Sequence, residues 1–129
     1  MKISSILNYN VNTIAASDTI NKALEIMNSM NFNGMPVVNR DRELVGMIVK
    51  ADVYRFLIEQ GHYDSYPVEM VMSKSVITAE VNEDILVVAK RLRESNIVAI
   101  PVLDNEKVVG IISMENLIDY YISTELKEQ

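Results

Sequence analysis

Two stretches of this chain repeat each other, and this repeat constrains the fold more than any other feature of the sequence. Residues 34–52 read GMPVVNRDRELVGMIVKAD, and residues 99–116 read AIPVLDNEKVVGIISMEN. A fixed-period repeat is one supersecondary unit used more than once, and each copy needs a neighbour to bury its apolar face. The chain is therefore expected to fold as two similar halves.

The repeat covers nearly the whole sequence. A shift of 65 places residues 1–38 on residues 66–103, and after one deleted residue in the turn the shift becomes 64. The apolar pattern follows the identities throughout. We predict repeat 1 over residues 1–60, a linker over residues 61–65 and repeat 2 over residues 66–126.

Each copy predicts the same order of elements, β-α-β-β-α. Residues 11–15 and 76–81 are short strand candidates rich in β-branched side chains. Ser17 or Asp18 in the first copy, and Asn82 in the second, are candidate N-caps for the helices that follow. Apolar side chains recur there at helical spacing, namely Ile20, Ala23, Leu24, Met27 and Met30, and Ile85, Val88, Ala89 and Leu92.

A hairpin and a closing helix complete each copy. The strands MPVV and LVGMIV are joined by the turn NRDRE, and the strands IPVL and VVGIIS by the turn DNEK. Closing helices are expected from about residue 50 to 60 and from about residue 114 to 127. The predicted fold class is α/β.

The closing helices carry a wider apolar surface than one core requires. At 100° per residue the apolar arc is about 240° in the second closing helix and about 200° in the first, against a little over 100° for a helix packed on one sheet. The excess predicts a homodimer; a helix wedged between the two repeats is the alternative. The apolar side chains are Leu117, Ile118, Tyr120, Tyr121, Ile122 and Leu126, and Val53, Tyr54, Phe56, Leu57 and Ile58.

Composition excludes several classes of function. The 129 residues include 12 basic and 18 acidic side chains, so the formal net charge is −6, which argues against a bulk electrostatic grip on nucleic acid or an anionic membrane. The chain has no cysteine, and its one histidine, His62, is expected to be solvated in the linker. No stretch approaches the ~20 apolar residues of a membrane span. We expect a cytoplasmic protein with no nucleic-acid or membrane partner.

The strand motif h-P-V, followed by G-h-h-[ST]-x-x-[DN] leading into a helix, occurs twice in the same order. This tandem arrangement resembles the cystathionine-β-synthase (CBS) domain pair over residues 1–58 and 66–126. The resemblance implies two repeats packed about a pseudo-twofold axis, with their sheets facing and their helices outside, and two clefts between them. It also implies a homodimer and an adenosine-containing ligand: AMP, ADP, ATP, S-adenosylmethionine or a dinucleotide. No cofactor is required, although a bound nucleotide can carry magnesium.

The resemblance assigns roles to particular positions of the motif. A hydroxyl that meets phosphate falls on Ser113 but is replaced by Val49 in the first copy, and an acidic side chain that meets ribose falls on Asp52 but is replaced by Asn116 in the second. Lys50, beside Val49, can supply charge to a phosphate instead. The adenine is expected to lie against strand residues of both copies, which are Thr13, Met35 and Pro36, and Thr78, Ile100 and Pro101.

Each of these interpretations has an alternative that needs no ligand. Ser113 and Asn116 form the pattern of a helix cap. Gly46 and Gly110 interrupt apolar strands, which indicates close approach of another group to the backbone or tight packing against a neighbouring helix. The strand residues of the adenine wall also fit an ordinary core.

The sequence contains no catalytic constellation. It has no nucleophile–base pair and no Gly-rich phosphate loop. We therefore predict a regulatory module, not an enzyme, that binds an adenine nucleotide and signals through its dimer geometry to an effector protein. The alternative is a scaffold of the same fold whose altered motifs no longer bind a nucleotide.

Overall fold

The computed structural model describes residues 1–128, and the side chains of residues 1–126. The chain forms two compact units, Asn12–Val76, here called the N-unit, and Met1–Val11 together with Ile77–Gln129, here called the C-unit. Both are mixed α/β structures, so the predicted fold class is confirmed. Among the described helices, none is both long enough and apolar enough to cross a membrane.

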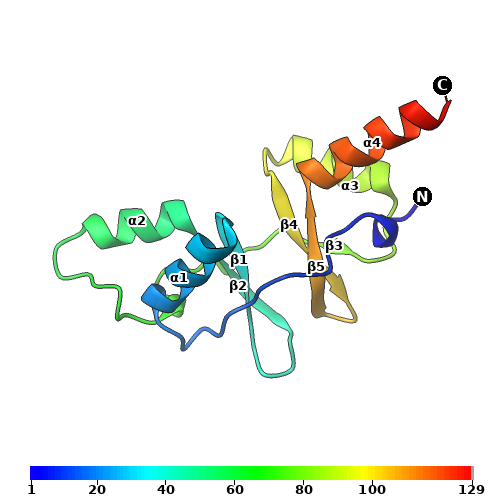
Figure 1. Ribbon diagram of the computed structural model, residues 1–129. Coiled ribbons are helices and arrows are strands. Elements are labelled where there is room, and N and C mark those ends of the chain that lie inside the picture. Colours follow the sequence, from blue (N-terminus) through cyan, green and yellow to red (C-terminus); the bar gives the residue numbers. More distant parts are fainter. Residues whose placement is uncertain (129) are drawn as a thin grey trace. The chain divides into compact units, whose positions relative to one another are not determined.

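The N-unit is built on an antiparallel hairpin on which two α-helices pack (Figure 1). The hairpin pairs Gly34 with Val49 at its open end and has an irregular register between Val37 and Val38. Single bridges extend it on both sides, from Ile14 to Val37 in parallel and from Ser73 to Met47 in antiparallel orientation. Its elements are α1 (Ile20–Met30), β1 (Gly34–Val38), β2 (Leu44–Val49), α2 (Lys50–Ile58) and the short 3₁₀ helix η2 (Val68–Met70).

The C-unit repeats this plan with a three-stranded sheet in the order β3-β4-β5. Ala79 pairs in parallel with Val102, β4 and β5 form an antiparallel hairpin, and Asn8 forms an antiparallel bridge to Ile111. Both predicted hairpins are therefore confirmed. Its elements are η1 (Ile3–Ser5), β3 (Ala79–Glu80), α3 (Ile85–Glu94), β4 (Ala99–Asp104), β5 (Lys107–Ser113) and α4 (Met114–Glu128).

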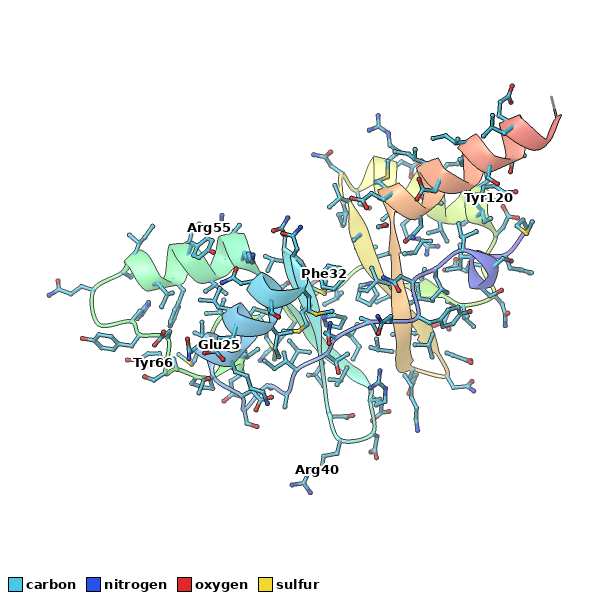
Figure 2. All side chains as sticks on the ribbon, viewed as in Figure 1. Glu25, Phe32, Arg40, Arg55, Tyr66 and Tyr120 are labelled. Atoms are coloured by element: carbon cyan, nitrogen blue, oxygen red, sulfur yellow. The ribbon has the colours of Figure 1, made fainter. Side chains whose placement is uncertain are left out.

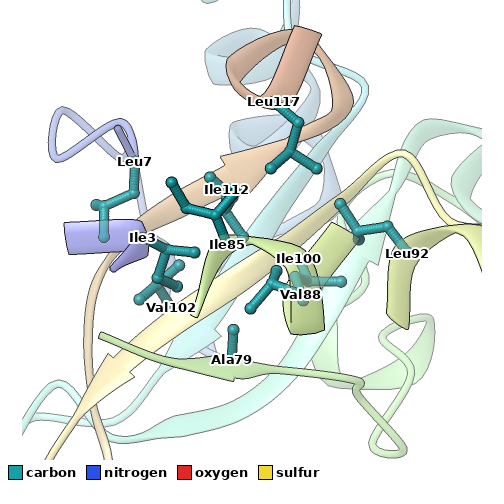
Figure 3. Packing of buried hydrophobic residues seen from close by; sticks show 10 residues of the cluster. All are labelled: Ile3, Leu7, Ala79, Ile85, Val88, Leu92, Ile100, Val102, Ile112 and Leu117. Carbon is teal, nitrogen blue, oxygen red and sulfur yellow. The ribbon is translucent and has the colours of Figure 1, made fainter. Parts of the chain in front are cut away.

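The two cores correspond position by position. Each of the nine fully buried apolar residues of the N-unit core has a counterpart in the C-unit core at a shift of 65 before the turn and 64 after it. Figure 3 shows the C-unit core, in which side chains from the sheet, the helices and the N-terminal segment meet. The pairs are Val68 with Ile3, Ile14 with Ala79, Ile20 with Ile85, Ala23 with Val88, Met27 with Leu92, Met35 with Ile100, Val37 with Val102, Ile48 with Ile112, and Val53 with Leu117.

The first segment of each repeat packs in the unit built mainly from the other repeat. Met1–Val11 is part of the C-unit, although it opens the first repeat, and residues 66–76 are part of the N-unit, although they open the second. We call Met1–Val11 exchanged segment 1 and residues 66–76 exchanged segment 2. The predicted boundaries at residues 60 and 66 describe the sequence repeat and stay a prediction.

The first strand of each repeat is shorter than predicted. Of residues 11–15 only Ile14 forms a bridge, and of residues 76–81 only Ala79 and Glu80 form a strand. The β-branched residues that precede them lie where the chain passes from one unit to the other. Propensity alone does not make a strand there, because no neighbouring strand is available to pair with.

The helix caps also differ from the prediction. The N-cap of α1 is Thr19, whose hydroxyl accepts from the Lys22 N–H at 3.1 Å, and the N-cap of α3 is Asp84, whose carboxylate accepts from the Leu86 N–H at 3.0 Å. Asp18 instead closes the turn before the helix, where its carboxylate accepts from the Ala15 N–H at 3.1 Å. Each helix begins one or two residues later than predicted.

His62 is not the solvated linker residue that the sequence predicted. Its ring stacks on Phe56 with the centroids 4.0 Å apart, and its Nδ1 lies 2.9 Å from the Phe56 carbonyl oxygen at the end of α2. The Tyr66 ring packs edge-on against Phe56, and its hydroxyl donates to the Gly61 carbonyl. An aromatic cluster therefore anchors the predicted linker to the N-unit.

Candidate functional site

In both units the second hairpin strand runs without a break into a helix. β2 passes into α2 at Val49, and β5 passes into α4 at Ser113. The first N–H of each helix donates a hydrogen bond of 2.8 Å to the carbonyl oxygen of the residue that precedes the first hairpin strand of its unit. In the N-unit Lys50 donates to Asn33, and in the C-unit Met114 donates to Val98. The two helix starts therefore share this backbone hydrogen bond, and they differ in their side chains.

The helix start of the N-unit has no side-chain cap. Val49, in the N-cap position, is extended (φ −126°, ψ 148°) and accepts no hydrogen bond through its side chain. The Asp52 carboxylate lies in the first turn, is 35% exposed and forms an ion pair with Arg55. An acidic side chain at this end of a helix is favoured by the helix dipole. The first turn of α2 thus presents an accessible carboxylate, flanked by Lys50, and N–H groups that no side chain caps.

The helix start of the C-unit is closed by its own side chains. The Asn116 side-chain carbonyl accepts from the Ser113 N–H and from the Ser113 hydroxyl, both at 2.9 Å, and the Asn116 N–H donates to the Ser113 Oγ at 3.2 Å. This reciprocal arrangement is a capping box. The capping alternative for Ser113 and Asn116 is therefore what the structure contains.

The strand residues of the predicted adenine wall belong mainly to the two cores. Met35 and Ile100 are 2% and 1% exposed, and their side chains lie within the apolar clusters. Pro36 and Pro101 are buried in the same strands, and the Pro36 carbonyl accepts from the Ile14 N–H. Met35 and Ile100 support the two hairpins from inside the cores, and a ligand contact through the backbone of these four residues stays a prediction.

Thr13 precedes Ile14, which pairs with β1, and Thr78 precedes Ala79, which pairs with β4; both threonines are half-buried. The Thr78 carbonyl accepts from Arg91 at 3.0 Å. Thr13 borders an open hollow of about 550 Å³ that also touches Val38, Asn39 and Arg40. That hollow lies at the turn end of the β1–β2 hairpin, whereas Val49 and Asp52 follow the opposite end, so the two features are separate. Figure 2 shows Arg40 extending away from the hairpin turn.

An ion pair in the C-unit was not predicted from the sequence. Arg91 of α3 donates from both terminal nitrogens to the Glu83 carboxylate, at 2.6 and 2.7 Å. This hydrogen bonding from Arg91, with that from the Glu80 N–H, holds the pKa of Glu83 below its usual value, and Glu83 in turn raises the pKa of Arg91. The eight-residue separation carries no helical signal, because Glu83 lies before α3 begins.

Gly46 and Gly110 leave room for protein backbone. A Cβ at Gly110 would lie 2.5 Å from the Asn8 carbonyl oxygen and 2.4 Å from a Leu7 methyl, and one at Gly46 would lie 2.9 Å from the Ser73 carbonyl oxygen. Close approach to the strand backbone is confirmed, and the approaching groups are the exchanged segments. Neither glycine is packed this closely against a helix.

Comparison with known proteins identifies the family. The sequence model of the CBS domain family matches this chain twice, over residues 3–59 and 68–123. The chain belongs to the CBS domain family. Within residues 1–128, no group of three or more His, Asp or Glu side chains lies close enough together to hold a metal ion.

The curated relatives are much longer than this chain. It is 35% identical over 116 residues to a homoserine O-acetyltransferase of Methanococcus vannielii, covering 89% of this chain and 24% of that protein. It is 36% identical over 106 residues to an L-aspartate semialdehyde sulfurtransferase of Methanosarcina acetivorans, covering 81% of this chain and 21% of that protein. The chain spans about a quarter of the length of these relatives or less.

Solved structures of CBS domain pairs have the same fold. The CBS domain pair of protein MJ0100, in complex with 5′-methylthioadenosine and S-adenosyl-L-methionine, is 28% identical with a TM-score of 0.83, and the match covers 96% of this chain and 98% of that one. A putative acetoin utilization protein (AcuB) from Vibrio cholerae is 21% identical with a TM-score of 0.90, covering 99% and 96%. The second match establishes the fold alone.

Proposed function

We propose that this chain is a regulatory module that binds an adenosine-containing ligand and transmits its occupancy to another protein. The observation that carries the proposal is the open helix start of the N-unit, where the accessible Asp52 carboxylate and N–H groups without a side-chain cap lie together. Membership in the CBS domain family and the likeness to the MJ0100 pair support the ligand class.

The N-unit is the stronger site in this proposal. The Asp52 carboxylate binds Arg55 through Oδ1, so its Oδ2 is the oxygen that can accept charge-assisted hydrogen bonds from ribose hydroxyls, and these are about twice as strong as neutral ones. In the C-unit, a ligand must break hydrogen bonds between Ser113 and Asn116 before it can use either side chain. Asn116 also offers only a neutral amide.

The ligand we propose carries no phosphate at the ribose 5′ position. Val49 supplies a methyl-bearing surface where a hydroxyl would be needed to bind phosphate, which favours a thioether or sulfonium substituent over a phosphate. S-Adenosylmethionine and 5′-methylthioadenosine have these substituents, and both are bound by the MJ0100 pair. AMP, ADP and ATP are the competing ligands, and they depend on Lys50 for charge.

We propose as partner an enzyme that acts on a four-carbon amino acid. Related modules occur within a homoserine O-acetyltransferase and an L-aspartate semialdehyde sulfurtransferase. Homoserine and aspartate semialdehyde share their carbon skeleton with the amino-acid part of S-adenosylmethionine. A module that binds this nucleoside is suited to report product level to such an enzyme.

The module is proposed to act as a homodimer through its closing helices. On α4 the side chains of Ile118, Tyr121, Ile122 and Leu126 are 45–64% exposed along one face. Tyr54 and Ile58 occupy the positions on α2 equivalent to Ile118 and Ile122, and they are 49% and 83% exposed. Exposed apolar faces of this kind favour association.

The second candidate function is a scaffold that binds no nucleotide. The closed capping box of the C-unit favours it, because that helix start is satisfied without a ligand. The two candidates differ in one measurable property, since a ligand that binds only the folded state must raise its melting temperature.

Calorimetry with S-adenosylmethionine, 5′-methylthioadenosine and AMP tests the proposal. Asp52→Ala is expected to weaken nucleoside binding roughly ten- to a hundredfold, as expected for the loss of charge-assisted hydrogen bonds. Asn116→Ala, the matched change in the second repeat, should leave the tighter site within about twofold of wild type. Val49→Thr should tighten AMP and leave 5′-methylthioadenosine unchanged.

Two results would contradict this proposal. Wild-type affinity in Asp52→Ala with loss of binding in Asn116→Ala would place the stronger site in the C-unit. Absence of binding and of any thermal shift with all three compounds would favour the scaffold.

A further inference from the structure

Each exchanged segment docks on the strand that leads into the other repeat's helix start. In the C-unit, Asn8 and Ile111 exchange both backbone hydrogen bonds, at 2.8 and 2.9 Å, two residues before Ser113. In the N-unit, Ser73 and Met47 do the same at 2.8 and 2.9 Å, two residues before Val49. Each candidate helix start therefore lies two residues after a strand residue that is hydrogen-bonded to an exchanged segment.

The docking sites are shaped for these segments. Segment 1 buries Ile3 and Leu7 in the C-unit core at 0% and 6% exposure, and segment 2 buries Val68 in the N-unit core at 0% exposure. Gly110 and Gly46 supply the space in which the segment backbone crosses the strand. A side chain at either glycine would overlap the segment.

A second chain of contacts links segment 1 to Thr78, a residue of the predicted adenine wall. The Ile3 N–H donates to the Glu83 carbonyl at 3.0 Å, the Glu83 carboxylate binds Arg91, and Arg91 donates to the Thr78 carbonyl at 3.0 Å. The N-unit has the first contact, from the Val68 N–H to the Asp18 carbonyl at 2.8 Å. It has Ile26 at the position equivalent to Arg91.

We propose that each exchanged segment is a strap that positions the helix start of the other repeat. Segment 1 holds the first turn of α4, with Ser113 and Asn116, and segment 2 holds the first turn of α2, with Val49 and Asp52. Undocking one strap loosens one helix start and leaves the other in place. This inference goes beyond the proposed function and does not depend on which ligand binds.

Amide hydrogen exchange on the ligand-free 129-residue chain tests the proposal with a matched pair of variants. Gly110→Ala should speed exchange by tenfold or more at Ile111, and at Met114 and Asn116 in the first turn of α4, whose N–H groups donate to Val98 and Ser113, because the new methyl displaces Leu7 and Asn8. Exchange in β2 and the first turn of α2 should change less than twofold. Gly46→Ala should give the reverse pattern, with faster exchange at Met47 and at Lys50, whose N–H groups donate to Ser73 and Asn33.

The outcomes decide the question in either direction. Faster exchange at Asn8 and Ile111 with an unchanged first turn of α4 would overturn the proposal, as would equal acceleration in both units. If either glycine variant does not fold, Leu7→Ala and Met72→Ala replace the pair, because they remove apolar contacts of the two segments without adding atoms. These variants must give the same unit-specific pattern for the proposal to stand.

Discussion

Asp18 and Glu83 occupy equivalent positions in the two repeats and show how one neighbour changes a carboxylate. Each closes a turn by accepting the N–H of the residue three before it, at 3.1 and 2.8 Å. Asp18 adds an ion pair with Lys22 at 3.3 Å, whereas Glu83 is bound from two nitrogens by Arg91. A two-nitrogen guanidinium pair is geometrically specific in a way that a lysine contact is not.

The Glu83 pair predicts a particular dependence of stability on pH. Because hydrogen bonding lowers the pKa of Glu83 in the folded state from about 4.5, its contribution is fully present above pH 4.5 and is lost as the pH falls through the folded-state pKa. Glu83→Gln should lower the free energy of unfolding by roughly 1 kcal/mol at pH 7 and flatten its acid dependence. Denaturant titrations between pH 7 and pH 3 measure both effects.

Glu80→Gln is the control for that measurement, because it removes an equal charge three residues away. The Glu80 N–H, not its side chain, contacts Glu83. If the free energy of unfolding of both variants falls with pH as steeply as that of the wild type, the ion pair with Arg91 does not contribute to the acid dependence of stability.

Asn31 and Asn96 are identical in the two repeats for a reason that the sequence does not reveal. Both residues adopt left-handed backbone, with φ of 58° and 56°, at the ends of α1 and α3. Asn tolerates this conformation better than most side chains. The dihedral angle that explains the identity is visible only in the structure.

At the scale of elements, the two helix starts form a natural comparison. α4 has a complete capping box and α2 has none, although both continue directly from a hairpin strand. Loss of a Ser cap typically costs about 1 kcal/mol. The difference therefore affects the stability of the first helical turn as well as the candidate site.

We predict opposite effects from reciprocal changes at these helix starts. Ser113→Ala should lower the free energy of unfolding of the C-unit by about 1 kcal/mol, because the Asn116 N–H loses its acceptor. Val49→Ser should create the pattern Ser-x-x-Asp at α2 and stabilise its first turn by up to about 1 kcal/mol. Thermal unfolding followed by circular dichroism measures both changes; a destabilised Val49→Ser would show that the buried part of Val49 outweighs the new cap.

Hairpins and long helices were predicted well, and the short first strands were not. Alternating apolar residues around a turn define β1–β2 and β4–β5 locally, so their pairing can be inferred from adjacent sequence. Ile14 and Ala79 pair with strands more than twenty residues away. The length of those pairings depends on where the chain leaves the unit, which local periodicity does not encode.

At the scale of the whole molecule, the exposed α4 face leads to a prediction about assembly. Ile122→Glu places a charge in the middle of the face formed by Ile118, Tyr121, Ile122 and Leu126. The variant should remain folded, since Ile122 is already 54% exposed, and should be largely monomeric at micromolar concentration.

Light scattering with sedimentation measures the oligomeric state. Glu115→Lys, an exposed change of charge at the start of the same helix, is the control and should leave assembly unchanged. A monomeric wild-type protein at micromolar concentration would end the dimer proposal.

The repeat predicted the fold family and most candidate residues, but not the composition of each unit. Ile3 and Val68 are equivalent in sequence, and the alignment of the two copies does not tell which core receives which side chain. Likewise, Ser113 and Asn116 fit both a ligand site and a cap until their hydrogen bonds are known. Long-range packing and side-chain geometry decided these questions.

The exchanged segments also bear on how such a chain arises by duplication. A single repeat holds a segment that completes another core and lacks the segment that completes its own. Two separate copies of a half-chain can supply this only to each other, so their folding would depend on concentration. Joining the copies in tandem makes the exchange intramolecular, at an effective concentration that dilution does not reduce. Duplication would thereby have converted an obligate association between two molecules into a property of one.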